Sequence, residues 1–542
     1  MHTVSSCAWF MLRASCILPV LILINAGSAF LPLSMRAQTR AALDAAVQTE
    51  SWEECTIGVA SGRATADGRP MIWKTRDTDN RDNAIYRNSS YRYRFLTIVD
   101  AGSRQNSWIS LNEKGFAILN SALYDLTGGT SGLANGAFMT YAAGTCASVA
   151  DFRRLLDSTN VTGRRTAANF AVMDSTGAAA IFETGGYAYW AYDALDTIAC
   201  PRGYVLRTNF SFAGGGTEGL VRYQRTTALF DGFFAGDSIT PKTILRYQMR
   251  DLADPTGVPY PLPYHGTVGS APYGYIPIDL TICRAYTASA AVIQGVRPGE
   301  SVQTSTFWAI LGSPAAGITV PYWVACDLPL PSVDLPKAPL TNAANEIFAK
   351  IYGGPAWPAY LKSFLLRDDN GQGLFGNLFQ AEDVILAAAD SILSLWRQGQ
   401  CAVSDMQRAE STYAAFALES LRAASGGIVD VRSDLSIAAV DGYALHQNYP
   451  NPFNPSTMIR YDLPGRSHIT LTVYNRLGQQ VSVLVQGDQD AGHHEVRFDG
   501  RNLASGVYFY QLKAHPLDFA TARGSAGGAG DFVLTRTLSL LR

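Results

Sequence analysis

CTIGVASGRATADGRPMIWKTRDTD, residues 55–79, begins with a cysteine that stands directly before an alternating apolar run. The runs Thr56–Ala60 and Pro70–Trp73 flank an Asp-Gly pair at 67–68. Two apolar runs joined through such a turn predict a β-hairpin. A group of charged residues follows the second run at 74–79. The stretch therefore predicts a strand pair with a thiol at its start and charges at its end.

The N-terminus has the order of a secretory signal. An arginine precedes the apolar stretch Ile17–Ile24, and small residues follow it. We expect residues 1–29 to be removed as a signal peptide and residues 30–54 to form a propeptide, with a cut after Ala37 as an alternative to the first boundary. The apolar stretch is too short to span a bilayer. No later run approaches that length, so we expect no transmembrane anchor after signal removal.

The composition is that of a globular protein and does not favour a nucleic-acid partner. The formal net charge is -2, with 47% apolar and 16% charged residues. Because there is no basic excess, we expect no nucleic-acid partner.

Six of the eight cysteines follow the signal segment. Their even number permits disulfides in an exported protein, but their irregular spacing leaves the pairing open.

The rest of the chain divides into a long mixed region and a short strand-rich region. Between 55 and 427 strand patterns alternate with a few helical ones, which predicts an α+β domain. A helical hairpin is predicted at 376–424, and residues 428–443 are expected to be a linker. From 444 to 542, short β-branched and aromatic runs recur between turns, which predicts a small all-β sandwich.

Histidine is scarce where a catalytic thiol would need it. Within 55–427 the only histidine is His265, so a Cys-His or Ser-His-Asp mechanism would depend on that residue. No ligand spacing for a metal and no nucleotide-binding motif is present, so we expect neither metal nor cofactor. An α-amino group, with a pKa near ~7.7–8.0, can serve as the base instead. Cleavage before Cys55 would place the thiol and the α-amino group on one residue. The alternative is that Cys55 is a half-buried structural cysteine of a strand.

The stretch quoted above resembles the mature start of N-terminal nucleophile (Ntn) hydrolases of the cysteine type, a group that includes penicillin acyltransferases, choloylglycine hydrolases and secreted dipeptidases. The group's Arg-x-x-Asp element is best matched by Arg76 and Asp79, although Lys74 and Asp77 offer a competing register. The resemblance implies a four-layer αββα core and an autoprocessed nucleophile, Cys55. It also implies cleavage of a linear C–N amide bond in a small molecule, by hydrolysis or by acyl transfer.

Three later segments are similar to the same group. The first, LNEKGFAILNSAL at 111–123, implies a site asparagine at Asn120, while Asn112 is expected to serve only the turn. The second, YVLRTNFSF at 204–212, implies that Asn209 lines the oxyanion hole, where such donors contribute roughly 3 to 4 kcal/mol each. The third, EGLVRYQRTTALF at 218–230, implies a site arginine at Arg222 or Arg225. Arg76 is expected to lower the thiol pKa, and Asp79 to hold the new ammonium.

The terminal region resembles a type A sorting domain of the type IX secretion system. The similarity lies in LHQNYPNPFNPSTMIRYDLP and AGHHEVRFDGRNLASGVYFYQL. It implies an immunoglobulin-like sandwich, the type IX machinery as partner, and a secreted or cell-surface location. Two other functions stay open: a secreted dipeptidase of the same fold, and a non-catalytic surface binding protein on a degenerate hydrolase scaffold, because fold alone does not confer activity.

Overall fold

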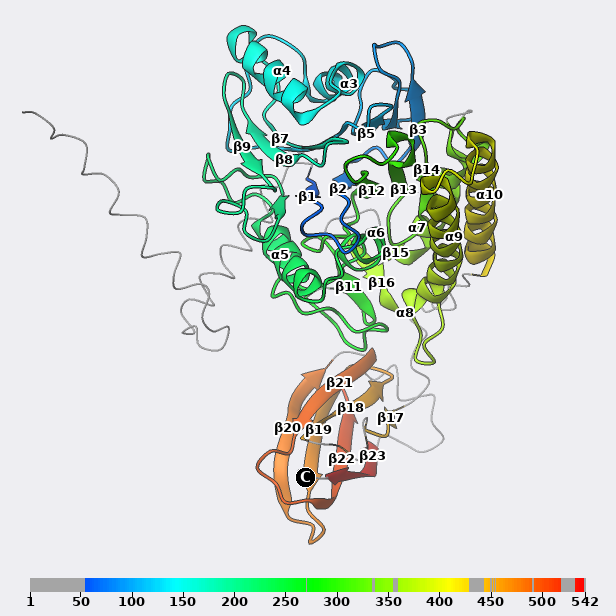
Figure 1. Cartoon of the computed structure of the whole chain (residues 1–542). Coiled ribbons are helices and arrows are strands. Elements are labelled where there is room, and N and C mark those ends of the chain that lie inside the picture. Colours follow the sequence, from blue (N-terminus) through cyan, green and yellow to red (C-terminus); the bar gives the residue numbers. More distant parts are fainter. Residues whose placement is uncertain are drawn as a thin grey trace, which may run out of the picture. The chain divides into compact units, whose positions relative to one another are not determined.

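Figure 1 shows the chain in a computed structural model. The signal peptide, the propeptide up to residue 53 and nearly all of the expected linker lie outside the described residues. Among the described helices, none combines the length and the hydropathy of a membrane span. The structure describes residues 54–269, 271–333, 337–353, 359–427, 443–448, 451, 453, 455–489, 492–517 and 532–540.

The predicted hairpin forms the centre of a six-stranded antiparallel sheet, in which Thr56 pairs with Thr75 and Ala60 with Met71. Its second strand does not end at Trp73 but continues to Asp77, and every residue in both strands is buried. Charges therefore lie within the sheet rather than after it. The strands, in sheet order, are β10 (Tyr204–Arg207), β1 (Thr56–Ala60), β2 (Met71–Asp77), β12 (Thr287–Gln294), β13 (Thr306–Leu311) and β14 (Val320–Tyr322).

A second sheet of seven strands runs in chain order, so that each strand pairs with the next. Two of its tight turns need glycine, because Gly115 and Gly177 have φ angles of 79° and 92°. The strands are β3 (Asn83–Asn88), β4 (Phe95–Asp100), β5 (Ile109–Asn112), β6 (Ala117–Ala122), β7 (Ala168–Met173), β8 (Ala179–Thr184) and β9 (Tyr189–Asp193).

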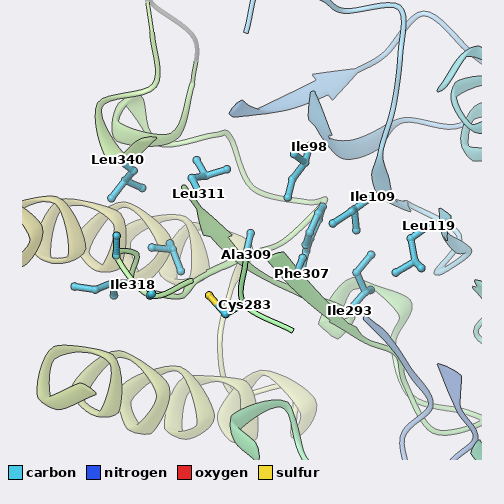
Figure 2. Close-up of a cluster of buried hydrophobic side chains, with 14 of the residues drawn as sticks. Ile98, Ile109, Leu119, Cys283, Ile293, Phe307, Ala309, Leu311, Ile318 and Leu340 are labelled. Atoms are coloured by element: carbon cyan, nitrogen blue, oxygen red, sulfur yellow. The ribbon is translucent and has the colours of Figure 1, made fainter. Parts of the chain in front are cut away.

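Alternation of side chains across β2 separates two apolar layers. Ile72 faces the seven-stranded sheet, and the core between the sheets is the one in Figure 2, where Ile98, Leu119 and Phe307 lie together. Trp73 faces the opposite way and stacks on Phe230 with ring centroids 4.7 Å apart. By the same alternation Lys74 points inward, between the two sheets.

Helices cover both outer faces. The seven-stranded sheet is covered by α3 (Asn135–Thr145) and α4 (Val149–Thr162), and the six-stranded sheet packs on α5 (Leu220–Ala235) and α9 (Leu374–Arg397). The expected mixture of helices and strands is confirmed. The other elements are α6 (Pro241–Thr243), a π-helical turn (Ile244–Gln248), β11 (Tyr275–Pro277), 3₁₀ turns at Val302–Thr304 and Leu330–Ser332, α7 (Pro339–Ile351), β15 (Tyr352–Gly353), β16 (Tyr360–Lys362), α8 (Ser363–Leu366) and α10 (Val403–Gly427).

The C-terminal region is rich in sheet, as expected, and has its own apolar core, which includes Tyr461, Leu471, Tyr510 and Leu538. One of its two sheets has three strands and the other has four. They are β17 (Ala444–Leu445), β18 (Ser456–Leu463) and β21 (Gly492–Asp499), and β19 (Ser467–Tyr474), β20 (Gln480–Gln489), β22 (Gly506–Pro516) and β23 (Phe532–Leu540).

Candidate active site

Cys55 lies directly before β1, and its backbone is held by side chains from distant parts of the sequence. Its amide nitrogen donates to Asn209 Oδ1 at 2.9 Å, and its carbonyl oxygen accepts from Arg222 Nη1 at 3.1 Å. Asn209 follows β10, the strand that pairs with β1, and its Nδ2 donates to the Ala122 carbonyl at 3.0 Å. The nitrogen that cleavage would turn into an α-amine therefore already has a fixed acceptor.

The thiol of Cys55 borders a small cavity between the sheets. The cavity has a volume of about 20 Å³, room for about one water molecule, and Lys74, Trp108 and Asn120 also line it. Lys74 Nζ donates to Asn120 Oδ1 at 2.8 Å. Burial raises the pKa of the Cys55 thiol above its ordinary value, and the positive charge of Lys74 opposes that shift. With residue 54 still attached, the thiol is thus held in its neutral form.

The structure favours the Lys74 and Asp77 register over the expected Arg76 and Asp79. Asp79 is exposed because the chain leaves the sheet after residue 77, so the structure does not bring it to the Cys55 cavity. Arg76 does line the cavity, but it is engaged by Asp100 at 2.7 Å and by Asn83 at 2.6 Å. It lowers the pKa of the thiol less than Lys74 does. Lys74 is therefore the main cation beside the sulfur.

Asp77, at the end of β2, is a second buried group beside Cys55. Its Oδ1 accepts from Thr287 Oγ1 at 2.7 Å, and its Oδ2 lies 3.9 Å from Arg284 Nη1. Burial raises the pKa of Asp77 to about 6, against the opposing charges of Arg284 and Arg222. This carboxyl group therefore changes its charge close to neutral pH.

Glu54, the residue before the expected cleavage point, is buried with its carboxylate between two arginines. Its Oε2 accepts from Arg222 Nη2 and from Arg284 Nη1. Burial by itself would raise the pKa of Glu54, but the two arginines outweigh it and hold that pKa below its ordinary value. Neither Glu54 nor Arg284 was predicted as a site residue from the sequence. The only available signal for Glu54 was its place before Cys55, and no local signal marked Arg284.

Of the two candidate arginines on α5, only Arg222 reaches Cys55. Besides the Cys55 carbonyl and Glu54, it donates to Thr56 Oγ1 at 3.2 Å. Arg225 lies about 4.5 Å further along the helix axis. There it pairs with Asp251 at 2.6 Å.

Both asparagines expected at the oxyanion hole lie close to Cys55. Asn120 borders the cavity, with its Oδ1 held by Lys74. Asn209 uses its Oδ1 to accept from the Cys55 nitrogen, and its Nδ2 donates to the Ala122 carbonyl. Its neighbour Thr208 is fixed by Asn169 Nδ2, which donates to the Thr208 carbonyl at 3.1 Å. Asn112 closes the turn before β6 through its Oδ1, and its Nδ2 also donates to the Ala143 and Cys146 carbonyls at 2.8 and 2.7 Å.

No histidine contacts the Cys55 cluster among the residues that the structure describes. His265 pairs with Asp369. Within the same ranges, no group of three or more His, Cys, Asp or Glu is arranged to hold a metal ion. All six cysteines after the signal segment are free thiols, namely Cys55, Cys146, Cys200, Cys283, Cys326 and Cys401.

Comparison with known proteins identifies the terminal domain. Residues 447–519 match the family model described as a secretion system C-terminal sorting domain. The expected sorting domain is confirmed, and the chain is exported, to the cell surface or as a secreted protein. The domain implies the type IX secretion machinery as the partner in that export.

For the larger domain the comparisons are weak. Among curated proteins, none matches the chain significantly. Penicillin V acylase from Agrobacterium tumefaciens is similar at 13% identity, over 50% of this chain and 86% of that chain, with a TM-score of 0.32. A mutant conjugated bile acid hydrolase from Clostridium perfringens is similar at 12% identity, over 49% of this chain and 92% of that chain, with a TM-score of 0.31. Scores of this size do not establish a shared fold.

Proposed function

We propose that the chain is a secreted Ntn amidohydrolase that cleaves a linear C–N amide bond, with Cys55 as the first residue of the mature protein. One observation carries the proposal. The Cys55 nitrogen donates to Asn209 Oδ1 at 2.9 Å, while the sulfur lies beside Lys74 in a buried cavity. Two packed sheets with helices on both outer faces support a four-layer αββα core. The two small terminal sheets support an immunoglobulin-like sandwich.

Processing uses the same thiol. The sulfur of Cys55 attacks the carbonyl carbon of Glu54; a C–S bond forms, the C–N bond between residues 54 and 55 breaks, and the nitrogen becomes the α-amine. Water then releases the propeptide as its carboxylic acid. The clamp on the Glu54 side chain holds the acyl group in place, because both arginines are themselves buried.

In catalysis the α-amine takes the proton of the thiol, and the thiolate attacks the substrate carbonyl. Lys74 stabilises the thiolate, and ionised Asp77 balances the new ammonium. Because Lys74 holds the Oδ1 of Asn120, the NH₂ group of that side chain is left to donate to the oxyanion. The ammonium returns the proton to the leaving amine. Water completes hydrolysis of the thioester; a second amine in its place gives acyl transfer.

N-terminal sequencing of the secreted protein tests the proposal, together with iodoacetamide labelling. We expect a mature chain that starts at Cys55 and a thiol that reacts rapidly, with both features lost in Cys55→Ala. An intact bond between residues 54 and 55 in a fully active protein would end the proposal. A different start without turnover indicates the binding protein, and preferential cleavage of dipeptides over N-acyl amides indicates the dipeptidase.

A further inference from the structure

We infer that Arg222 and Arg284 form a carboxylate subsite for the acyl part of the substrate. The preferred substrate is then an amide whose acyl group carries a carboxylate separated by three carbon atoms from the scissile carbonyl, as in an N-glutaryl amide. The inference rests on the proposed function, because the subsite becomes available only when the bond before Cys55 is cleaved.

The first argument is the chemistry of processing. When the Cys55 sulfur attacks the Glu54 carbonyl, the chain passes through a thioester in which the acyl group is that of Glu54. Hydrolysis of a substrate amide passes through a thioester on the same sulfur. The residues that hold the acyl side chain in the first thioester are therefore placed to hold it in the second. In the structure those residues are Arg222 and Arg284.

The second argument is the balance of buried charge. Arg222 is 2% exposed and Arg284 is 4% exposed, so neither guanidinium is neutralised by solvent. Among the described residues, the carboxylates of Glu54 and Asp77 face this pair. Cleavage removes the Glu54 carboxylate and leaves Asp77 facing two arginines. A buried excess of positive charge is costly unless an anion compensates it.

The third argument is geometric. Arg222 donates to the Cys55 carbonyl at 3.1 Å, to Thr56 Oγ1 at 3.2 Å and to Asn209 Oδ1 at 3.2 Å. These contacts do not involve Glu54, so they keep the guanidinium in place after the propeptide leaves. The Arg222 part of the subsite is thus preformed.

The reaction that follows is balanced. The Cys55 thiolate adds to the glutaryl carbonyl carbon, a C–S bond forms, and the C–N bond breaks as the amine takes a proton from the α-ammonium. Water then adds to the thioester, a C–O bond forms and the C–S bond breaks. The products are glutarate, the free amine and the regenerated thiol.

Three p-nitroanilides test the subsite on the mature full-length protein. N-glutaryl-p-nitroanilide carries the carboxylate, N-(4-carbamoylbutanoyl)-p-nitroanilide replaces it with a neutral amide, and N-pentanoyl-p-nitroanilide replaces it with a methyl group. We expect kcat/KM for the glutaryl compound to exceed both others by a factor on the order of 100, since hydrogen bonds to charged groups in a buried site discriminate to that extent. Equal values for the three compounds would overturn the inference.

Two matched variants test whether Arg284 is responsible for the preference for the glutaryl compound. Arg284→Gln is expected to reduce the ratio of glutaryl to pentanoyl kcat/KM to within about tenfold of unity. Arg225→Gln removes an arginine of α5 that binds Asp251 instead, and it is expected to leave the ratio unchanged. A ratio that survives Arg284→Gln, or that falls equally in Arg225→Gln, contradicts the assignment.

A second readout does not depend on the leaving group. Glutarate is expected to slow the alkylation of Cys55 by iodoacetamide at concentrations where pentanoate does not, because only the dianion places one carboxylate at the sulfur and the other between the arginines. Equal protection by both acids overturns the inference. If Cys55-dependent turnover persists without preference, the proposed function stands and the subsite fails; if the bond before Cys55 stays intact, both fail.

Discussion

Around Cys55, six charged side chains are at most 4% exposed, namely those of Glu54, Lys74, Arg76, Asp77, Arg222 and Arg284. In the terminal domain, by contrast, the pair His468 and Asp488 has both side chains 49% exposed. Exposed pairs contribute little to stability, whereas buried charges are costly and persist only when they are paired. The charges around Cys55 are thus held out of water, whereas this pair of the terminal domain is solvated, and the terminal domain matches a sorting domain.

The largest effect is expected when the Cys55 thiol is removed. In Cys55→Ala we expect no cleavage before residue 55 and a loss of amide hydrolysis by a factor of at least about 10⁴, because both the nucleophile and the α-amine disappear. N-terminal sequencing and anilide turnover measure the effect. The matched control is Cys401→Ser, since Cys401 is the one described cysteine that is not fully buried. Retained turnover in Cys55→Ala removes Cys55 from the mechanism.

The next largest effect concerns Asp77 in the unprocessed Cys55→Ala chain. Its pKa in the folded chain, about 6, lies above the ordinary value of 3.8, so the folded state binds the Asp77 proton more tightly than the unfolded state does. The resulting contribution to the free energy of unfolding is present below about pH 4 and is lost as pH rises through 6. Relative to its parent, Asp77→Asn should therefore gain stability between pH 4 and 6, by at most about 3 kcal/mol. Urea titrations at several pH values, followed by tryptophan fluorescence, give the difference. A difference that does not vary with pH contradicts this assignment.

Asn209 allows a test of how the Cys55 nitrogen is held. Asn209→Ala removes the acceptor of that nitrogen, and we expect processing to slow by roughly 100-fold, the cost of one buried unsatisfied group. Asn209→Asp keeps an acceptor at the same place and should process faster than the alanine variant. Time courses on a denaturing gel compare the two. Equal rates for both variants would show that the acceptor does not matter.

A smaller effect is expected from Lys74. Lys74→Met retains the length of the side chain but removes the charge that lowers the thiol pKa. The iodoacetamide rate of mature Cys55 at pH 7 should fall about tenfold, because a higher thiol pKa leaves less of the reactive thiolate. Lys114→Met is the matched control, because Lys114 lies exposed in the turn before β6. A similar fall in the control assigns the effect to overall charge instead.

The smallest effect is expected from removing the terminal domain, because its apolar core is its own. All nine tryptophans lie at or before residue 396, so tryptophan fluorescence follows only the larger domain. For a chain that ends at residue 427, we expect a free energy of unfolding within about 0.5 kcal/mol of the full chain, while export is lost. A change of several kcal/mol would show that the two domains stabilise each other.

Much of the site could be predicted from short motifs. The resemblance to the Ntn hydrolases implied Cys55, Asn120 and Arg222 or Arg225, and the structure brings Cys55, Asn120 and Arg222 close together. Asp79 lies outside this cluster because buried partners extend β2 only to Asp77. Arg225 lies outside it because a neighbouring loop supplies Asp251 as its partner, which the sequence of the helix does not reveal.

By itself, the sequence determined the hairpin that carries Cys55, the scarcity of histidine near it and the sorting domain at the end of the chain. These features depend on neighbours within a few residues, so local propensity and spacing contain them. Only the tertiary structure decided that Lys74 and Asp77 lie beside the thiol, and that Arg284 and Arg222 meet at Glu54. Arg284 and Glu54 are 230 residues apart, and which distant charges are buried together is settled by the packing of the two sheets, where each charge is stable only beside its counterpart.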